Sequence, residues 1–259
     1  MKVGSVLNLR DVGGCATRDG RVVRSGLVYR SMALHGVRDA DRDAFDALGL
    51  RTVFDLRTTL ERTAMPDVPI DGIRPVVLDV FAGEQWVDPV RLAEVLTNPP
   101  AAREVLGNGN GRAHYEQVYR ELVTRASARA AYAALFRALA QPDALPALVH
   151  CTTGKDRTGW AVAALLALLG VDDDDVLHDY LRSNDELLPG FSAVFDAFAD
   201  AGGDTDGLRA VIGVRPEYLA AAQAEMHERF GSVERYFAVG LGVDADARDA
   251  LVDALVTER

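Results

Sequence analysis

Cysteine and lysine are both scarce in this sequence. The 259 residues include two cysteines, Cys15 and Cys151, which are too few for a disulfide framework. The two lysines are Lys2 and Lys155, so arginine supplies almost all of the fixed positive charge. A chain with so few thiols is typical of a reducing compartment. We therefore expect a cytoplasmic protein, with export lacking a recognisable signal peptide as the alternative.

Long hydrophobic runs and an excess of positive charge are also absent. The longest apolar stretch, residues 160–169, is far too short to cross a bilayer, and the N-terminus has no signal-peptide pattern. We therefore predict no transmembrane segment. The net charge of -11 argues against non-specific nucleic-acid binding and, weakly, against docking on anionic membranes. A local basic pocket can still bind phosphate, and the sequence does not indicate an oligomeric state.

Hydrophobic patterning predicts an α/β protein with a mostly parallel central sheet flanked by helices. Residues 21–31 are predicted to be extended, buried strands are predicted at 51–56 and 73–80, and a short apolar strand is predicted at 147–150. Helices are predicted at residues 88–106, 113–123, 127–140 and 158–169, and through most of the chain from 192 onward. Residues 107–111, rich in glycine and asparagine, are expected to form a mobile loop.

One segment, residues 150–159 with the sequence HCTTGKDRTG, combines the residue types that phosphate chemistry needs. It lies between a predicted strand and a predicted helix. Such a turn presents backbone N–H groups and the positive end of a helix dipole to one point. Cys151 opens the loop and Arg157 closes it, with five residues between them. The segment therefore predicts an anion site that contains a nucleophile.

The predicted chemistry is transfer of a phosphoryl group to Cys151. A helix N-terminus and nearby cations favour a thiolate, which can attack phosphorus and form a phosphocysteine. Loop amides and the Arg157 guanidinium can hold the oxygens of the transferred group, and Gly154 lets an amide approach closely. The residues expected to bind the phosphate are Thr152, Thr153, Gly154, Lys155, Asp156 and Arg157.

Two flanking side chains have supporting roles in this scheme. Thr158 is positioned to donate its hydroxyl to the sulfur of Cys151 as the intermediate breaks down, and His150 is expected to orient the loop through hydrogen bonds. The alternative interpretation is a buried structural cysteine beside an exposed arginine. The adjacent histidine, the glycine, the Lys-Asp pair and the Thr-Gly helix start disfavour that alternative.

The same segment resembles the signature loop of the protein tyrosine phosphatases, in the Lys-Asp-Arg form found in bacterial members. The resemblance spans nearly the whole chain, through residues 8–11 (NLRD), 29–31, 55–57, 179–185 and 213–219. It implies a single phosphatase domain over residues 1–259, with a helical lid near 186–230 that includes Phe191, Phe195, Phe198 and Tyr218. The alternative for these four aromatic residues is ordinary core packing of amphipathic helices. Residues 81–112 depart from the family pattern and are interpreted as a variable insertion.

The resemblance also implies a function. It implies hydrolysis of phosphotyrosine, with phosphoserine, phosphothreonine and phosphoinositides as further substrates, and neither a metal nor another cofactor. The partner is then a phosphorylated protein or a phosphoinositide. In this group of phosphatases the aspartate inside the loop is taken as the general acid, which corresponds to Asp156 here. Asp79, at the end of a predicted strand, is the alternative acid, and the other role for Asp156 is to shape the loop.

Several charged residues near predicted strand ends are further candidates. Lys155 either favours highly charged substrates or is a solvated loop lysine. Ligands of open α/β sheets bind outside the carboxyl ends of the strands, so other candidates either line the pocket or brace its loops in arginine–aspartate pairs. These are Arg10, Asp11, Arg30, Asp55 and Arg57, of which we interpret Asp55 and Arg57 as support.

Rival functions remain open at this stage. A phosphate-binding pseudophosphatase would usually lack the cysteine or the arginine, and both are present. An arsenate reductase would need resolving cysteines, whereas one remote cysteine is available, and a sulfurtransferase would need a different loop. A metal-dependent phosphatase is disfavoured because the sequence shows no clustered histidine and aspartate ligands.

Overall fold

The computed structural model describes residues 4–83 and 110–259. Strands are β1 (Arg10–Asp11), β2 (Val22–Val23), β3 (Val28–Ser31), β4 (Thr52–Asp55), β5 (Arg74–Val77), β6 (Ala147–His150) and β7 (Val256–Thr257). The α-helices before the C-terminal third are α1 (Arg42–Asp46), α2 (Thr59–Ala64), α5 (Asn110–Thr124), α6 (Ala126–Leu139), α7 (Arg157–Leu168) and α8 (Asp173–Leu187). Those that follow are α9 (Ser192–Asp200), α10 (Thr205–Ile212), α11 (Pro216–Phe230), α12 (Val233–Arg235) and α13 (Ala245–Leu255).

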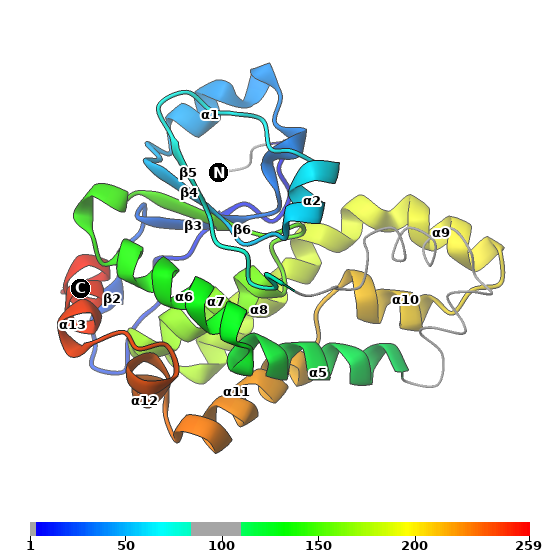
Figure 1. Ribbon diagram of the computed structural model, residues 1–259. Coiled ribbons are helices and arrows are strands. Elements are labelled where there is room, and N and C mark those ends of the chain that lie inside the picture. The colour runs from blue at the N-terminus through cyan, green and yellow to red at the C-terminus, as the bar shows by residue number, and fades with distance from the viewer. Residues whose placement is uncertain (1–3, 84–109) are drawn as a thin grey trace.

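A five-stranded, mostly parallel sheet lies at the centre, in the order β1-β3-β6-β4-β5. The pairs β3–β6, β6–β4 and β4–β5 are parallel, and β1 joins β3 antiparallel. Helices cover the sheet, as Figure 1 shows. The predicted fold class is therefore confirmed, and β6 is the middle strand. Its carboxyl end, where the HCTTGKDRTG segment begins, lies between the carboxyl ends of β3 and β4.

Alternating side chains assign the two faces of the sheet. Val53 of β4 and Leu148 of β6 are paired in register and belong to a small core with Phe45 of α1. Phe54 and Val149, the next residues along the same strands, point to the opposite side and join the main core. This is the alternation that a pleated strand requires when both faces are covered. The sheet is thus held between the N-terminal segment and a larger layer of helices.

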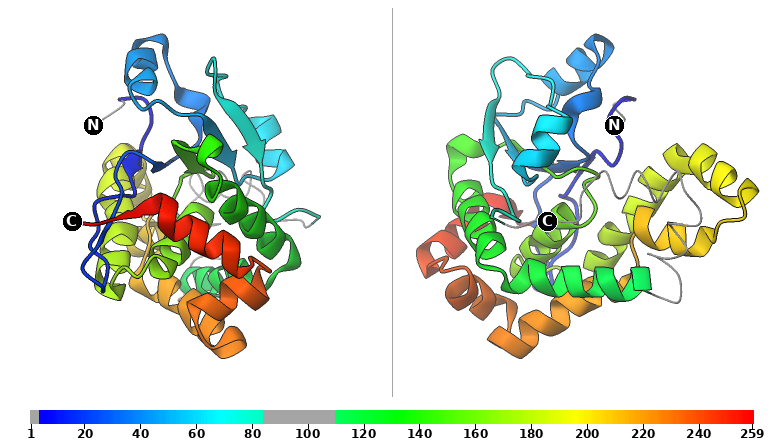
Figure 2. Two further views of the ribbon diagram at one scale, coloured as in Figure 1. Left: turned by 90° about the vertical axis from the view of Figure 1, so that its left-hand side faces the viewer. Right: turned by 45° about the vertical axis from the view of Figure 1, so that its right-hand side comes forward.

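The larger core lies on the side of α5 to α8. Helix α7 is apolar almost all round and is buried along most of its length, as expected for a helix between a sheet and other helices. The C-terminal helices α11, α12 and α13 complete this layer, and β7 pairs with β2 so that the C-terminus returns to the N-terminal region (Figure 2). The prediction of a mainly helical C-terminal part is confirmed.

Helices α9 and α10 form a satellite beside the main body (Figures 1 and 2). They enclose a separate small cluster of buried side chains, Phe198, Leu208 and Ile212. Phe191 and Phe195 pack against it, whereas Tyr218 of α11 stacks on Tyr115 of α5, with ring centroids 5.3 Å apart. Of the four aromatic residues assigned to a lid, three therefore belong to the satellite and Tyr218 belongs to the main body.

Two predictions from the sequence were wrong in part. The strand at residues 73–80 was expected to be buried, but β5 has three exposed residues, Arg74, Pro75 and Val77. It forms the edge of the sheet, where a proline is tolerated because one side of the strand needs no hydrogen bonds. The loop predicted at 107–111 is helical in its last two residues, which begin α5. Its other residues, and the helix predicted at 88–106, lie outside the described residues.

Within residues 4–83 and 110–259, none of the helices combines the length and the apolar character needed to cross a bilayer.

Candidate active site

Residues 151–156 form a tight loop from the end of β6 to the first residue of α7, Arg157. Cys151 is buried, with 1% of its surface exposed. Gly154 has a φ of +70°, and a Cβ at this position would lie 2.1 Å from the carbonyl oxygen of Ser31. Only glycine fits both the left-handed backbone and the contact with β3. The loop therefore lies tightly against the end of β3.

The carbonyl groups of this loop are held from outside. Asn8 donates its side-chain amide to the carbonyl oxygens of Thr153 and Gly154 at 3.1 and 3.0 Å. Arg30 donates to Gly154 O at 2.7 Å, and Ala33 N donates to Thr152 O at 3.0 Å. In a trans peptide the N–H of the next residue points opposite to the carbonyl. Bracing the carbonyls on one side therefore turns the N–H groups of residues 153–155 to the other side.

A buried cluster of charged residues holds these hydrogen-bond donors in place. Asp179 accepts hydrogen bonds from Arg10 and from Arg30, both at 2.8 Å, and the two guanidinium groups also lie within 3.4 Å of Ser183 Oγ. Burial alone would raise the pKa of Asp179, but Arg30 and Arg10 outweigh it and hold that pKa below its ordinary value. Burial and the charge of Arg30 lower the pKa of Arg10 to about 10. Helix α8 thus anchors the arginines of β1 and β3 under the loop.

Arg157 is fixed by Glu61 of α2. Its two terminal nitrogens donate to the two carboxylate oxygens of Glu61, each at 2.6 Å. Glu61 is the third residue of a helix capped by Thr58, whose backbone N–H it accepts at 2.9 Å. Thr152 also donates its hydroxyl to Glu61. Burial would raise the pKa of Glu61, but Arg157 outweighs burial and lowers it to about 2.

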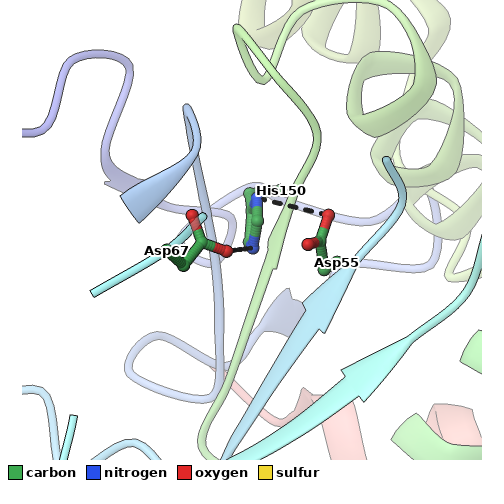
Figure 3. A group of neighbouring side chains, drawn as sticks. All are labelled: Asp55, Asp67 and His150. Carbon is green, nitrogen blue, oxygen red and sulfur yellow. Dashed lines mark ion pairs between the residues drawn. The ribbon is translucent and has the colours of Figure 1, made fainter. Parts of the chain in front are cut away.

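A second arginine, Arg57, binds the two aspartates that flank His150. Arg57 donates to Asp55 at 2.9 and 2.7 Å and to Asp67 at 2.6 Å. His150 lies between the same two aspartates (Figure 3), with Nε2 3.2 Å from Asp67 and Nδ1 3.9 Å from Asp55. Its Nδ1 is also 3.1 Å from the carbonyl oxygen of Cys151.

Asp55, Asp67 and His150 have donor atoms close enough together to hold a metal ion. The Arg57 guanidinium, however, already binds both carboxylates and supplies the positive charge that a cation would bring. Burial would raise the pKa of Asp67, but His150 and then Arg57 lower it below its ordinary value. The donor set therefore fits a metal poorly, and its geometry is that of a support for the start of the loop.

Lys155 and Asp156, both residues of the loop, form a partly buried ion pair. The Lys155 ammonium lies 2.9 and 2.8 Å from the two carboxylate oxygens of Asp156, and 4.5 Å from the ring centroid of Tyr115. Only 3% of Lys155 is exposed, so its interpretation as a solvated loop lysine is wrong. Burial works to lower the pKa of Lys155, but Asp156 and Tyr115 outweigh it, and the ammonium stays charged.

Comparison with known proteins now decides the family. A model of the tyrosine phosphatase family matches residues 1–257. The chain belongs to this family. The triple specificity protein phosphatase PtpB of Mycobacterium tuberculosis is 34% identical over 257 residues, covering 88% of this chain and 89% of that protein. A tyrosine-protein phosphatase of Nostoc commune is 30% identical over 214 residues, covering 80% and 67%.

The similarity of this tyrosine phosphatase to solved structures is lower than its similarity to these relatives. The core catalytic domain of the PP-IP phosphatase SIW14 from S. cerevisiae, in complex with citrate, gives a TM-score of 0.39 at 15% identity. That overlap covers 86% of this chain and 95% of that one. The family assignment rests on the sequence matches.

Most residues predicted for the site of this tyrosine phosphatase lie together around the loop. Asp11 makes its hydrogen bonds elsewhere, and the roles of Asp79 as the alternative acid and of Thr158 as a donor to the sulfur stay predictions. Asp11 accepts from the backbone of Gly13 and Gly26 at 2.8 and 2.6 Å, and so braces the N-terminal segment instead. Asp79 accepts from the backbone of Phe81 at 3.0 Å and of Thr59 at 3.3 Å. The Thr158 hydroxyl is buried and, among the described residues, has no hydrogen-bond partner.

Sequence reasoning missed the acidic partners of the site. Glu61 and Asp67 were not candidates, although the capping pattern Thr58-x-x-Glu61 is visible in the sequence and places a carboxylate at the start of a helix. Tyr115 and Tyr119 of α5 were also missed. No local sequence pattern indicates them, because they are far from the loop in the sequence and come close to it only through the packing of α5.

Proposed function

We propose that this tyrosine phosphatase cleaves phosphate monoesters through a phosphocysteine on Cys151. The sulfur attacks phosphorus, a sulfur–phosphorus bond forms, and the bond from phosphorus to the leaving oxygen breaks. Asp156 gives its proton to that oxygen. Water then attacks phosphorus while the Asp156 carboxylate takes a proton from it, the sulfur–phosphorus bond breaks, and inorganic phosphate leaves.

One observation carries this proposal. A buried cysteine and an arginine held by a carboxylate lie at the two ends of one loop, and hydrogen bonds hold the carbonyls of that loop. Glu61 holds two guanidinium nitrogens of Arg157, which fixes the plane of the group that would meet the phosphate oxygens. The loop carbonyls are held on one side by hydrogen bonds, which supports an arrangement in which the loop N–H groups point to the same anion on the other side. Preorganised donors of this kind stabilise the charge that develops on a transferred phosphoryl group.

The direct test is hydrolysis of p-nitrophenyl phosphate by the wild type and by Cys151→Ser, with and without a chelator. We expect activity that is lost in Cys151→Ser and that the chelator leaves unchanged. Activity retained in Cys151→Ser would contradict the proposal. A wild type that binds phosphate but turns nothing over would favour the pseudophosphatase alternative.

Substrate breadth is a second part of the proposal. We propose phosphotyrosine as the principal substrate, with phosphoserine, phosphothreonine and phosphoinositides as further ones. The name of the mycobacterial relative, a triple specificity phosphatase, supports breadth, and the charged, buried Lys155 of the loop supports highly anionic substrates. Lys155→Ala should weaken phosphoinositide hydrolysis more than phosphotyrosine hydrolysis, measured side by side. Equal losses on both would show that Lys155 does not select substrates.

Two further proposals concern the whole protein. We propose one phosphatase domain whose satellite, with α9 and α10, serves as a lid; its separate small core supports independent movement. We also propose a cytoplasmic location, because the mechanism needs a free Cys151 thiol and a reducing compartment preserves one. Both cysteines are free in the structure.

A further inference from the structure

The hydrogen-bond partners of the Asp156 carboxylate are unusual for its position at the start of a helix. It occupies the N-cap position of α7, where an aspartate usually accepts a hydrogen bond from the first turn of the helix. Asp156 makes no such bond. Its Oδ1 instead accepts the phenolic hydroxyl of Tyr119 at 3.0 Å, and Tyr119 in turn accepts the hydroxyl of Tyr180 at 2.7 Å. The side chain is thus turned away from the helix and towards two buried tyrosines.

We propose that Tyr119 is a positioning residue for Asp156, that Tyr180 fixes the Tyr119 hydroxyl, and that this pair selects which oxygen of Asp156 carries the proton given to the leaving group. The inference rests on the proposed role of Asp156 as the general acid. It adds two residues, from α5 and α8, that lie outside the loop and were not among the site residues predicted from the sequence.

The direction of the hydrogen bonds leads to the choice of oxygen. A tyrosine hydroxyl has one proton to donate. Among the described residues the Tyr180 hydroxyl has Tyr119 as its acceptor, so the Tyr119 oxygen accepts that proton and donates its own to Oδ1. A proton on Oδ1 would face this donor. The Lys155 ammonium contacts both oxygens and does not distinguish them. In the form of Asp156 that acts as the acid, the proton is therefore placed on Oδ2.

The packing keeps both hydroxyls in this arrangement. Tyr119 and Tyr180 are 0% and 1% exposed, and their rings meet edge to face with centroids 6.1 Å apart. A Cβ on Gly159 would lie 3.2 Å from the Tyr180 ring, so the glycine after Thr158 makes room for that ring beside the first turn of α7. Burial, with the nearby Asp156, raises the pKa of both tyrosines well above 10. Both hydroxyls therefore stay neutral donors at working pH.

The rival explanation is that these hydroxyls merely satisfy each other inside the core. A general acid matters most where the leaving group is a poor one, so dependence on the leaving group separates the two explanations. A purely structural loss would slow poor and good leaving groups alike. A loss of Asp156 positioning would slow phenyl phosphate, whose leaving group needs the proton, and would spare p-nitrophenyl phosphate.

The experiment measures kcat/KM, which reports the transfer of the phosphoryl group to Cys151, on both aryl phosphates for the wild type, Tyr119→Phe, Tyr180→Phe and Asp156→Asn. The control is Tyr236→Phe, which removes another buried hydroxyl, one that accepts from Trp160 at 3.2 Å. For Tyr119→Phe we expect a loss of about tenfold on phenyl phosphate, the usual size for a lost hydrogen bond to a charged group, and little change on p-nitrophenyl phosphate. Tyr180→Phe should show a weaker loss of the same kind, and Tyr236→Phe none.

Combination with Asp156→Asn completes the test. If Tyr119 acts through Asp156, adding Tyr119→Phe to Asp156→Asn should cause no further loss on phenyl phosphate. Equal losses on both substrates, or losses that multiply in the double variant, would overturn the inference while leaving a Cys151-dependent phosphatase intact. Activity that survives Cys151→Ser would instead refute the proposed function. Should Tyr119→Phe fail to fold, Tyr180→Phe and Gly159→Ala, which displaces the Tyr180 ring, test the same point.

Discussion

At the scale of single residues, the site depends on contacts that the sequence only partly reveals. Cys151, Gly154 and Arg157 were expected from their spacing, because a strand–loop–helix junction with these residues has a specific chemical meaning. The residues that hold them were harder to find. Glu61 reaches Arg157 from another helix, and Tyr119 reaches Asp156 from a third. Such partners are set by tertiary packing and leave almost no local signal.

Gly154 gives the sharpest prediction at this scale. A Cβ there would overlap the backbone of Ser31 at 2.1 Å, and the φ of +70° disfavours any other residue. Gly154→Ala should therefore displace the loop and lower kcat/KM about a hundredfold, since a small misplacement of reacting groups is enough for such a loss. Steady-state kinetics on p-nitrophenyl phosphate checks this.

The matched control is Gly170→Ala. Gly170 also has a positive φ, +84°, but the nearest atom to its Cβ position is 3.9 Å away, in Thr17. Its substitution strains the backbone beyond the far end of α7 without crowding the loop. We expect lower stability with kcat/KM nearly unchanged. Similar kinetic losses in both variants would mean that backbone strain, not the contact with Ser31, limits the loop.

At the scale of elements, the strands and helices next to the loop were predicted closely. The expected strand at 147–150 is β6, and the expected helix at 158–169 is α7 with a one-residue shift. The prediction was less accurate at β5, where an apolar run suggested burial and the strand lies at the sheet edge. Apolar composition does not distinguish an edge strand from a central one, because the position in the sheet is set by the order of pairing.

The satellite of α9 and α10 carries a prediction of its own. Phe198 is 3% exposed and lies in a small cluster separate from the main core. Phe198→Ala should leave a cavity there and cost about 3 kcal/mol of local stability. Hydrogen exchange of α9 and α10 should speed up, while β6 and α7 keep their protection. Faster exchange throughout the molecule would show instead that the satellite and the main body unfold as one unit.

At the scale of the whole molecule, a net charge of -11 coexists with a site built around buried arginines. Arg10, Arg30, Arg57 and Arg157 are all nearly inaccessible and lie at or near the loop. Each is paired with a carboxylate, so these arginines add no net positive charge to the protein surface. The composition therefore argues against broad polyanion binding through bulk charge alone, and it gives no information about the local pocket.

These buried pairs predict how stability depends on pH. Glu61, Asp67 and Asp179 have pKa values below the ordinary 4.5 and 3.8, that of Glu61 at about 2. The unfolded chain therefore takes up protons at a higher pH than the folded one. The stabilisation is complete above about pH 4.5 and is lost as the pH falls towards about 2. Urea unfolding between about pH 7 and pH 3 should show this decline.

Glu61→Gln isolates one of these contributions. The variant leaves Arg157 buried without its carboxylate, and should lose about 3 kcal/mol at neutral pH. The difference from the wild type should shrink as the pH falls below about 4.5, because the wild type then loses the same charge. A difference that stays constant down to about pH 3 would show that Glu61 stabilises the fold through packing and not through its charge.

The most direct test of the whole account is to trap the covalent intermediate. Phosphotyrosine or p-nitrophenyl phosphate is mixed with the wild type, the reaction is quenched in acid within one turnover, and the peptides are analysed by mass spectrometry. We predict one phosphoryl group on the peptide that contains Cys151, located on its sulfur and absent from Cys151→Ser. Steady turnover with an unmodified Cys151, or a phosphoryl group on another residue, would contradict the mechanism.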